Sequence, residues 1–115
     1  MTAKINYLEL PANDLSKIKS FYQQVFQWQF TDYGPEYSAF HTDEMEGGFY
    51  LADKSTTVAN GGVLIVFYDK DLSLIEKSIV KAGGTIVKEK FSFPGGARFH
   101  FADPCGNELA IWSEQ

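Results

Sequence analysis

The chain of 115 residues is long enough for one domain with a hydrophobic core and too short for two. Hydrophobic residues make up 44% and charged residues 22%, which is typical of a soluble globular domain. No apolar stretch reaches the length of a membrane span and no leader opens the sequence, so we expect a cytoplasmic protein without a membrane partner. The net charge is −5 and the 10 basic residues are scattered, which disfavours nucleic-acid binding. The single Cys105 excludes an internal disulfide and a Cys-based zinc site.

The first half of the chain predicts a strand, a helix and three further strands. Residues 3–10 alternate between two kinds of side chain, as a strand does. Asn13 or Asp14 can then cap a helix over about 14–27, because the apolar residues recur there at helical spacing. Three short strands are expected to follow, at about 28–33, 36–42 and 47–53.

The second half repeats this order of elements. Residues 62–68 predict a strand, and Asp69 or Asp71 can cap a helix over about 71–83 that ends at Gly83-Gly84. Three more strands are expected at about 85–89, 97–102 and 107–113. Each half therefore reads βαβββ, although the two halves are not similar in sequence.

The predicted fold is α+β, with two βαβββ modules in a single domain, module one at about 1–55 and module two at about 60–115. We expect a curved mixed eight-stranded sheet with two main helices, whose apolar stripes cover one side of the sheet. The other side keeps a mixture of aromatic, aliphatic and acidic side chains that suits a cup for a small molecule. These residues are Tyr7, Glu9, Leu64, Val66, Tyr68, Glu108, Ala110 and Trp112.

Three segments resemble one known superfamily. They are "YLELPANDLSKIKSFYQQVFQW", "FYDKDLSLIEKSIVKAGGTIV" and "FHFADPCGNELAIW", and together they span nearly the whole chain. In this order and spacing they resemble the vicinal oxygen chelate proteins: glyoxalases, bleomycin- and fosfomycin-resistance proteins and extradiol dioxygenases, which share the dihydroxybiphenyl dioxygenase fold. The chain is most similar to small single-domain members related to lactoylglutathione lyase.

The resemblance also implies where a divalent metal should be bound. The family's His, Glu or Gln ligands would fall at Tyr7, Leu64 and Ala110 of this chain. An isobutyl and a methyl group have no lone pairs, and a phenol keeps its proton at neutral pH. We therefore expect no metal and no other cofactor at these positions.

Two main functions remain open from the sequence. The first is a metal-free protein that binds a small organic molecule in an aromatic cup. There the resemblance to the resistance enzymes adds His100 as a ligand contact, and Glu9 and Glu108 favour a cationic or hydroxyl-rich ligand. The alternative is a metal-dependent lyase or isomerase, glyoxalase-like, with a displaced metal site that uses Glu9, His100 or Glu108. The competing interpretation is that Glu9 and Glu108 are strand residues at a solvated rim, or are paired with Arg98 or a lysine.

The sequence also leaves a third function open and indicates an oligomeric state. A module that only binds a protein partner is a third possible function, and no catalytic residue is assigned. We expect a homodimer, because the mixed residues would leave a large apolar patch in water on a monomer. A two-fold interface would cover part of this patch and leave two equivalent pockets at the seam.

Overall fold

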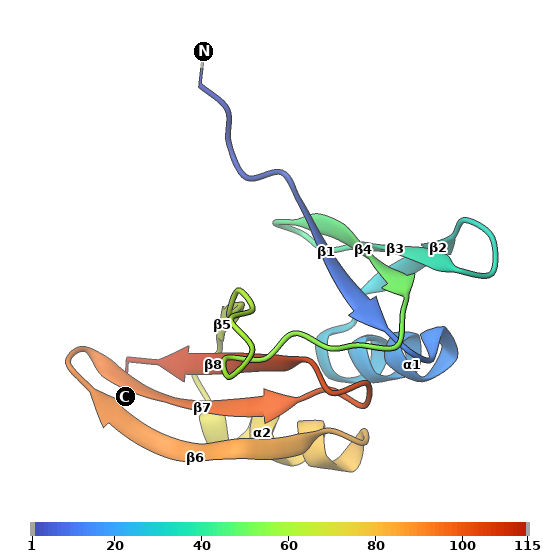
Figure 1. The fold of residues 1–115 in the computed structure, drawn as a ribbon. Coiled ribbons are helices and arrows are strands. Elements are labelled where there is room, and N and C mark those ends of the chain that lie inside the picture. Colours follow the sequence, from blue (N-terminus) through green and yellow to red (C-terminus); the bar gives the residue numbers. More distant parts are fainter. Residues whose placement is uncertain (1, 115) are drawn as a thin grey trace.

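The computed structural model describes residues 2–114 and arranges eight strands and two helices in two sheets (Figure 1). The elements in chain order are β1 (Tyr7–Ala12), α1 (Leu15–Phe26), β2 (Gln29–Asp32), β3 (Tyr37–His41), β4 (Glu46–Leu51), β5 (Val66–Tyr68), α2 (Leu72–Lys81), β6 (Thr85–Phe93), β7 (Gly96–Ala102) and β8 (Glu108–Ser113). Sheet A has the order β1-β4-β3-β2 and sheet B the order β5-β8-β7-β6. In each sheet the first pair is parallel and the others are antiparallel. The α+β class and the two βαβββ modules are confirmed, with the eight strands divided equally between the sheets.

Both predicted helices form within two residues of the expected ends. Asp14 caps α1 by accepting a hydrogen bond from the Lys17 amide at 3.0 Å, and Asp71 caps α2 by accepting one from the Leu74 amide at 3.1 Å. Helix α1 ends at Gln27, which adopts the left-handed conformation with φ 57°.

Three strands differ from their predicted extent, because a strand forms only where a neighbouring strand pairs with it, whatever its alternation of side chains. Residues 2–6 continue past the end of the ladder with β4 and extend away from the body of the chain (Figure 1). The fifth strand is shorter than predicted, since a turn at residues 58–61 precedes it, and Leu64 therefore lies outside β5. Strand β6 is longer than predicted and continues to Phe93, where it pairs with β7.

The core lies where the inner sides of the two sheets meet the helices. Tyr22 of α1 is fully buried and stacks on Trp28 at 4.7 Å between ring centroids, so Trp28 fills the corner after the helix. Phe26 stacks on Phe67 of β5 at 4.4 Å, which joins the two modules. None of the helices within residues 2–114 is long and apolar enough to cross a membrane.

The turn before β8 also joins the two modules, through a buried carboxylate. One oxygen of Asp103 accepts from the backbone amides of Cys105 and Asn107 at 2.9 and 3.1 Å. The other accepts from the Tyr22 hydroxyl at 2.9 Å and from the Asn107 side chain, which also donates to the Pro11 carbonyl. Burial raises the pKa of Asp103 despite these hydrogen bonds. Cys105 is buried within this turn.

Candidate functional site

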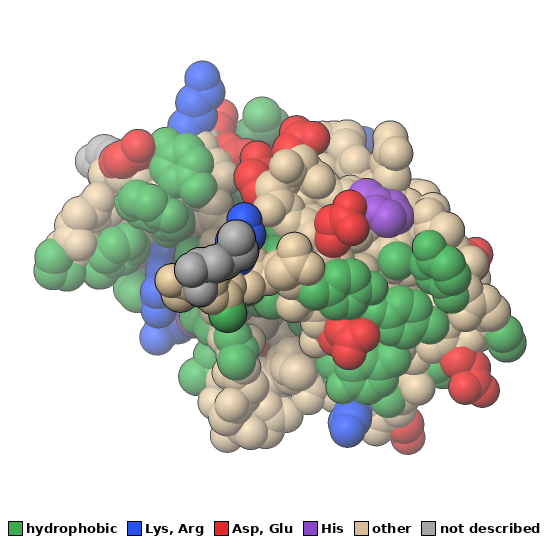
Figure 2. Space-filling model, turned by 90° about the horizontal axis from the view of Figure 1, so that it is seen from above, with side chains coloured by type: hydrophobic (Ala, Val, Ile, Leu, Met, Phe, Trp, Pro, Cys, Tyr) green, Lys and Arg blue, Asp and Glu red, His purple; other side chains and the backbone are tan. Residues whose placement is uncertain are grey.

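Each sheet has one side turned away from its helix, and we call these sides face A and face B. Face A belongs to sheet A and carries Tyr7, Glu9, Tyr37, His41 and Glu46. Face B belongs to sheet B and carries Val66, Tyr68, Lys88, Arg98, His100, Glu108, Ala110 and Trp112. Seen from above, hydrophobic and acidic side chains are interspersed on the side of the molecule that sheet A occupies (Figure 2).

Face A holds a chain of hydrogen bonds that ends on a carboxylate. The Tyr37 hydroxyl donates to Glu9 at 2.8 Å, and it lies 2.6 Å from the Tyr7 hydroxyl. Because the Tyr37 proton is directed to Glu9, Tyr7 donates to Tyr37. Partial burial, together with the bonds to Tyr7 and Glu9, raises the pKa of Tyr37 and keeps this phenol a neutral donor. Gly48 is required beneath it, since a Cβ there would overlap the Tyr37 ring.

A second polar chain crosses the other end of face A. His41 lies between Thr31, at 3.1 Å from its Nε2, and Glu46, at 3.4 Å from its Nδ1. Glu46 is exposed and His41 is partly exposed, so a bond between them contributes little to stability.

Face B is more enclosed and contains a buried histidine–carboxylate pair. His100 Nδ1 lies 2.8 Å from one oxygen of Glu108, and the other oxygen accepts from the Val58 amide at 3.1 Å. The two side chains are only 6% and 11% exposed. Burial raises the pKa of Glu108, but the bonds from His100 and Val58 outweigh burial, so this pKa lies below its ordinary value.

A basic and aromatic group beside this pair was not found from the sequence. The Arg98 guanidinium lies 5.4 Å from the Phe91 ring centre and 5.9 Å from that of Phe93, and Lys88 lies 4.6 Å from Phe91. The predicted strand ended at residue 89, before either Phe. The β6–β7 register is irregular on either side of Lys88. Simple alternation along β6 therefore does not predict which of its residues lie on face B.

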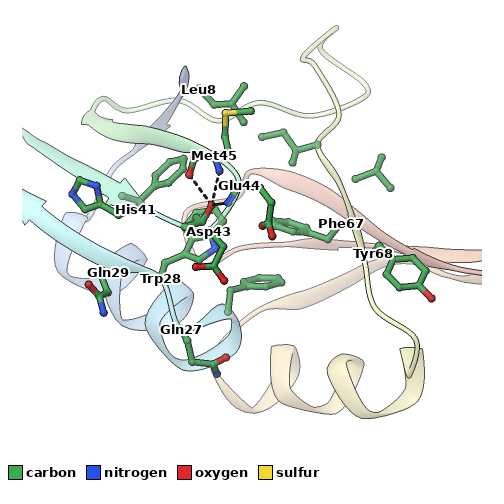
Figure 3. A pocket seen from close by; sticks show the side chains of 15 residues that line it. Leu8, Gln27, Trp28, Gln29, His41, Asp43, Glu44, Met45, Phe67 and Tyr68 are labelled. Atoms are coloured by element: carbon green, nitrogen blue, oxygen red, sulfur yellow. Dashed lines mark hydrogen bonds between the residues drawn. The ribbon is translucent and has the colours of Figure 1, made fainter. Parts of the chain in front are cut away.

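A cavity of about 900 Å³ is lined by residues of both sheets (Figure 3). Its apolar lining includes Leu8 of β1, Trp28 and Phe67 of β5, and its rim carries Asp43 and Glu44 from the turn between β3 and β4. Two predicted site residues on β5, Val66 and Tyr68, also line it. The cavity could accept an aromatic group beneath an acidic rim.

The residues present do not fit the metal that the fold implies. Of the three implied positions, Ala110 is a fully buried methyl group, Leu64 is aliphatic, and Tyr7 is a hydrogen-bonded phenol. The displaced alternative is not assembled either, because Glu9 lies on sheet A and both oxygens of Glu108 already accept hydrogen bonds. Within residues 2–114, no three His, Cys, Asp or Glu side chains gather where they could hold a metal ion.

The sequence matches one family model over most of its length. The model describes the Glyoxalase/Bleomycin resistance protein/Dioxygenase superfamily and matches residues 4–111. The chain belongs to this superfamily. A search of curated proteins finds no significant match.

Solved structures share the fold of this superfamily member. A glyoxalase/bleomycin resistance protein/dioxygenase family enzyme from Burkholderia phytofirmans PsJN is 18% identical, with a TM-score of 0.81 and coverage of 98% of this chain and 100% of the other. A glyoxalase-related enzyme from Fulvimarina pelagi is 18% identical, with a TM-score of 0.79 and coverage of 97% and 88%. A lactoylglutathione lyase from Agrobacterium tumefaciens is 19% identical, with a TM-score of 0.72 and coverage of 97% and 94%. At these identities the likeness shows the fold alone.

Proposed function

We propose that this superfamily member binds a small organic molecule without a metal, at a site that two copies complete. In the proposed homodimer, face A of one copy lies against face B of the other. The observation that carries this proposal is the complementary charge of the two faces. Face A presents the carboxylates of Glu9 and Glu46, whereas face B presents the cations of Lys88 and Arg98.

The free edges of the sheets support this assembly. Within residues 2–114, strands β1 and β5 each have one hydrogen-bonded neighbour and leave the other edge unpaired. Apolar side chains are exposed on and beside these edges: Ile5 by 79%, Tyr7 by 44%, Val63 by 82% and Val66 by 41%. If face A of one copy packed on face B of the other, these side chains could be covered at the seam, and the two-fold symmetry would give two equivalent sites.

The chemistry of the faces favours a ligand with polar groups and a flat body. The phenols of Tyr7 and Tyr37 and the carboxylate of Glu9 can bind hydroxyl or cationic groups. Trp112, 5.2 Å from Tyr68, can contact an aromatic or aliphatic ring. The side chains at the three implied metal positions are not metal ligands, so we expect hydrogen bonds and ring contacts to hold the organic ligand.

Calorimetry against a panel of cationic, hydroxylated and acidic aromatic compounds tests this function. At least one class should bind wild-type protein that was prepared with a metal chelator. Tyr37→Phe removes the hydroxyl that bonds Glu9 and should weaken binding about tenfold. Tyr33→Phe is the matched control, because Tyr33 is 65% exposed in the turn between β2 and β3 and should leave affinity unchanged. Uniform absence of binding, or binding only after a metal is added, would refute the proposal.

A further inference from the structure

Face B contains two buried polar atoms that lack a partner within residues 2–114. They are Nε2 of His100 and Nε of Arg98. Both residues belong to β7 and are two positions apart, so both side chains lie on the same side of the sheet. Buried polar atoms are nearly always hydrogen-bonded, which makes this pair unusual. Such atoms are expected where a ligand supplies the missing partners.

The surroundings of His100 determine which partner it needs. Glu108 accepts from Nδ1, so the proton of the neutral ring is on Nδ1 and Nε2 has a free lone pair. Arg98 Nε is always a donor. Within one copy the charged groups around the ring are Glu108 on β8, Lys88 on β6 and Arg98 on β7 itself. In the proposed dimer Glu9 and Glu46 of the second copy's face A lie across the seam from Lys88 and Arg98. Residues 55–65, the later part of the connection between β4 and β5, carry no charged side chain, and Asp53 and Lys54 precede them.

An acceptor beside a cationic donor suits a ligand with a weakly acidic O–H group. The flat shape follows from Phe91, whose ring lies 6.0 Å from the His100 ring and 5.4 Å from the Arg98 guanidinium. We propose that His100 accepts a proton from the hydroxyl of a planar ligand of the phenol or enol type, and that Arg98 binds the oxyanion that results. This inference rests on the proposed function and names the class of ligand for the same site.

The proton transfer is balanced in atoms and charge. The ligand O–H bond breaks, its electron pair stays on the oxygen, and a new N–H bond forms at Nε2 of His100. The oxyanion then faces the Arg98 guanidinium, and the imidazolium faces the Glu108 carboxylate. Glu108 is a positioning residue, because it fixes the tautomer and stabilises the imidazolium without touching the ligand.

Access to these atoms requires a local movement. His100 is 4% exposed, and Glu108 is tied to the connecting segment through the Val58 amide and the Thr56 carbonyl. A ligand reaches Nε2 when Phe91 or this segment shifts aside.

The probe for the test is para-nitrophenol, whose phenolate form absorbs visible light. Wild-type protein should bind it and hold it as the phenolate at a pH below its pKa in free solution. His100→Gln should abolish the phenolate spectrum of the bound probe. Arg98→Met should weaken binding about tenfold, and Glu108→Gln should retain binding but lower the phenolate fraction about tenfold. Tyr33→Phe, in the exposed turn between β2 and β3, is the control and should not change the spectrum.

A second readout does not depend on the probe. Nitrogen NMR of His100 in the free protein should show a protonated Nδ1 and a bare Nε2, and Glu108→Gln should shift this balance. The inference is overturned if the bound probe stays neutral, if His100→Gln leaves the phenolate spectrum intact, or if Nε2 carries the proton. If compounds of another class bind and para-nitrophenol does not, this inference fails while the proposed function stands. If no compound binds, both fail.

Discussion

Faces A and B each carry a hydrogen bond to a glutamate, and the two bonds have the same length but different surroundings. On face A a phenol donates to Glu9 at 2.8 Å, and on face B His100 Nδ1 lies 2.8 Å from Glu108. The first pair lies in contact with solvent, whereas the second is almost fully buried. The distances are equal, so the difference in consequence comes from burial: water replaces a lost partner on face A and cannot do so on face B. Each face is therefore suited to a different role, adaptable contact on A and fixed polarity on B.

The largest expected effect distinguishes the two sides of sheet A. A Cβ at Gly47 would collide with the backbone carbonyl of Leu8 and the buried ring of Phe40. Gly47→Ala should therefore lower the free energy of unfolding by about 3 kcal/mol. A Cβ at Gly48 would meet the Tyr37 ring, which can swing into solvent, so Gly48→Ala should cost about 1 kcal/mol. Urea denaturation measures both, and equal losses would show that face A is as tightly packed as the core.

Removing the two carboxylates compares the faces directly. Glu108→Ala leaves His100 Nδ1 and the Val58 amide without an acceptor and should lower the free energy of unfolding by about 2 kcal/mol. On face A of a single copy, Glu9→Ala leaves Tyr37 free to bond to water and should change it by less than about 0.5 kcal/mol at a dilution where the protein is monomeric. Chemical denaturation of both variants checks this. A similar loss for the two would contradict the role given to burial.

A smaller effect should appear in the pH dependence of stability. The pKa of Glu108 lies below its ordinary value of 4.5, so its contribution is present above that value and is lost as the pH falls through the lowered pKa. Asp103 has the opposite sign, because its pKa is raised from 3.8. Its contribution is complete below pH 3.8 and is lost as the pH rises through the raised pKa. Denaturation at a series of acid pH values should show a shallower acid loss for Glu108→Gln than for wild type, and an unchanged slope would contradict this assignment.

The order of elements and much of both faces could be predicted from the sequence. Alternation placed Tyr7 and Glu9 on one side of β1, and Ala110 and Trp112 on one side of β8, because these strands are regular. The same reasoning failed for β6, whose register irregularities depend on its pairing with β7.

The burial of the His100–Glu108 pair on face B could not be predicted from the sequence either. The Val58 amide that binds Glu108 is 50 residues away along the chain, in a segment with no periodic pattern. The assembly of two copies could not be predicted either, since no local sequence pattern shows which face of a second copy packs on face A.

Sedimentation of charge-reversed variants tests most directly the central claim that face A of one copy completes face B of another. Wild type should sediment as a species of twice 12.9 kDa at micromolar concentration. Glu9→Lys on face A and Lys88→Glu on face B should each shift the protein toward 12.9 kDa, because each places like charges across the interface. An equimolar mixture of the two variants should recover the dimer, since one seam is then wild type and the other has both charges exchanged. A 12.9 kDa species for wild type, or variants that dimerise as well as wild type, would contradict the account.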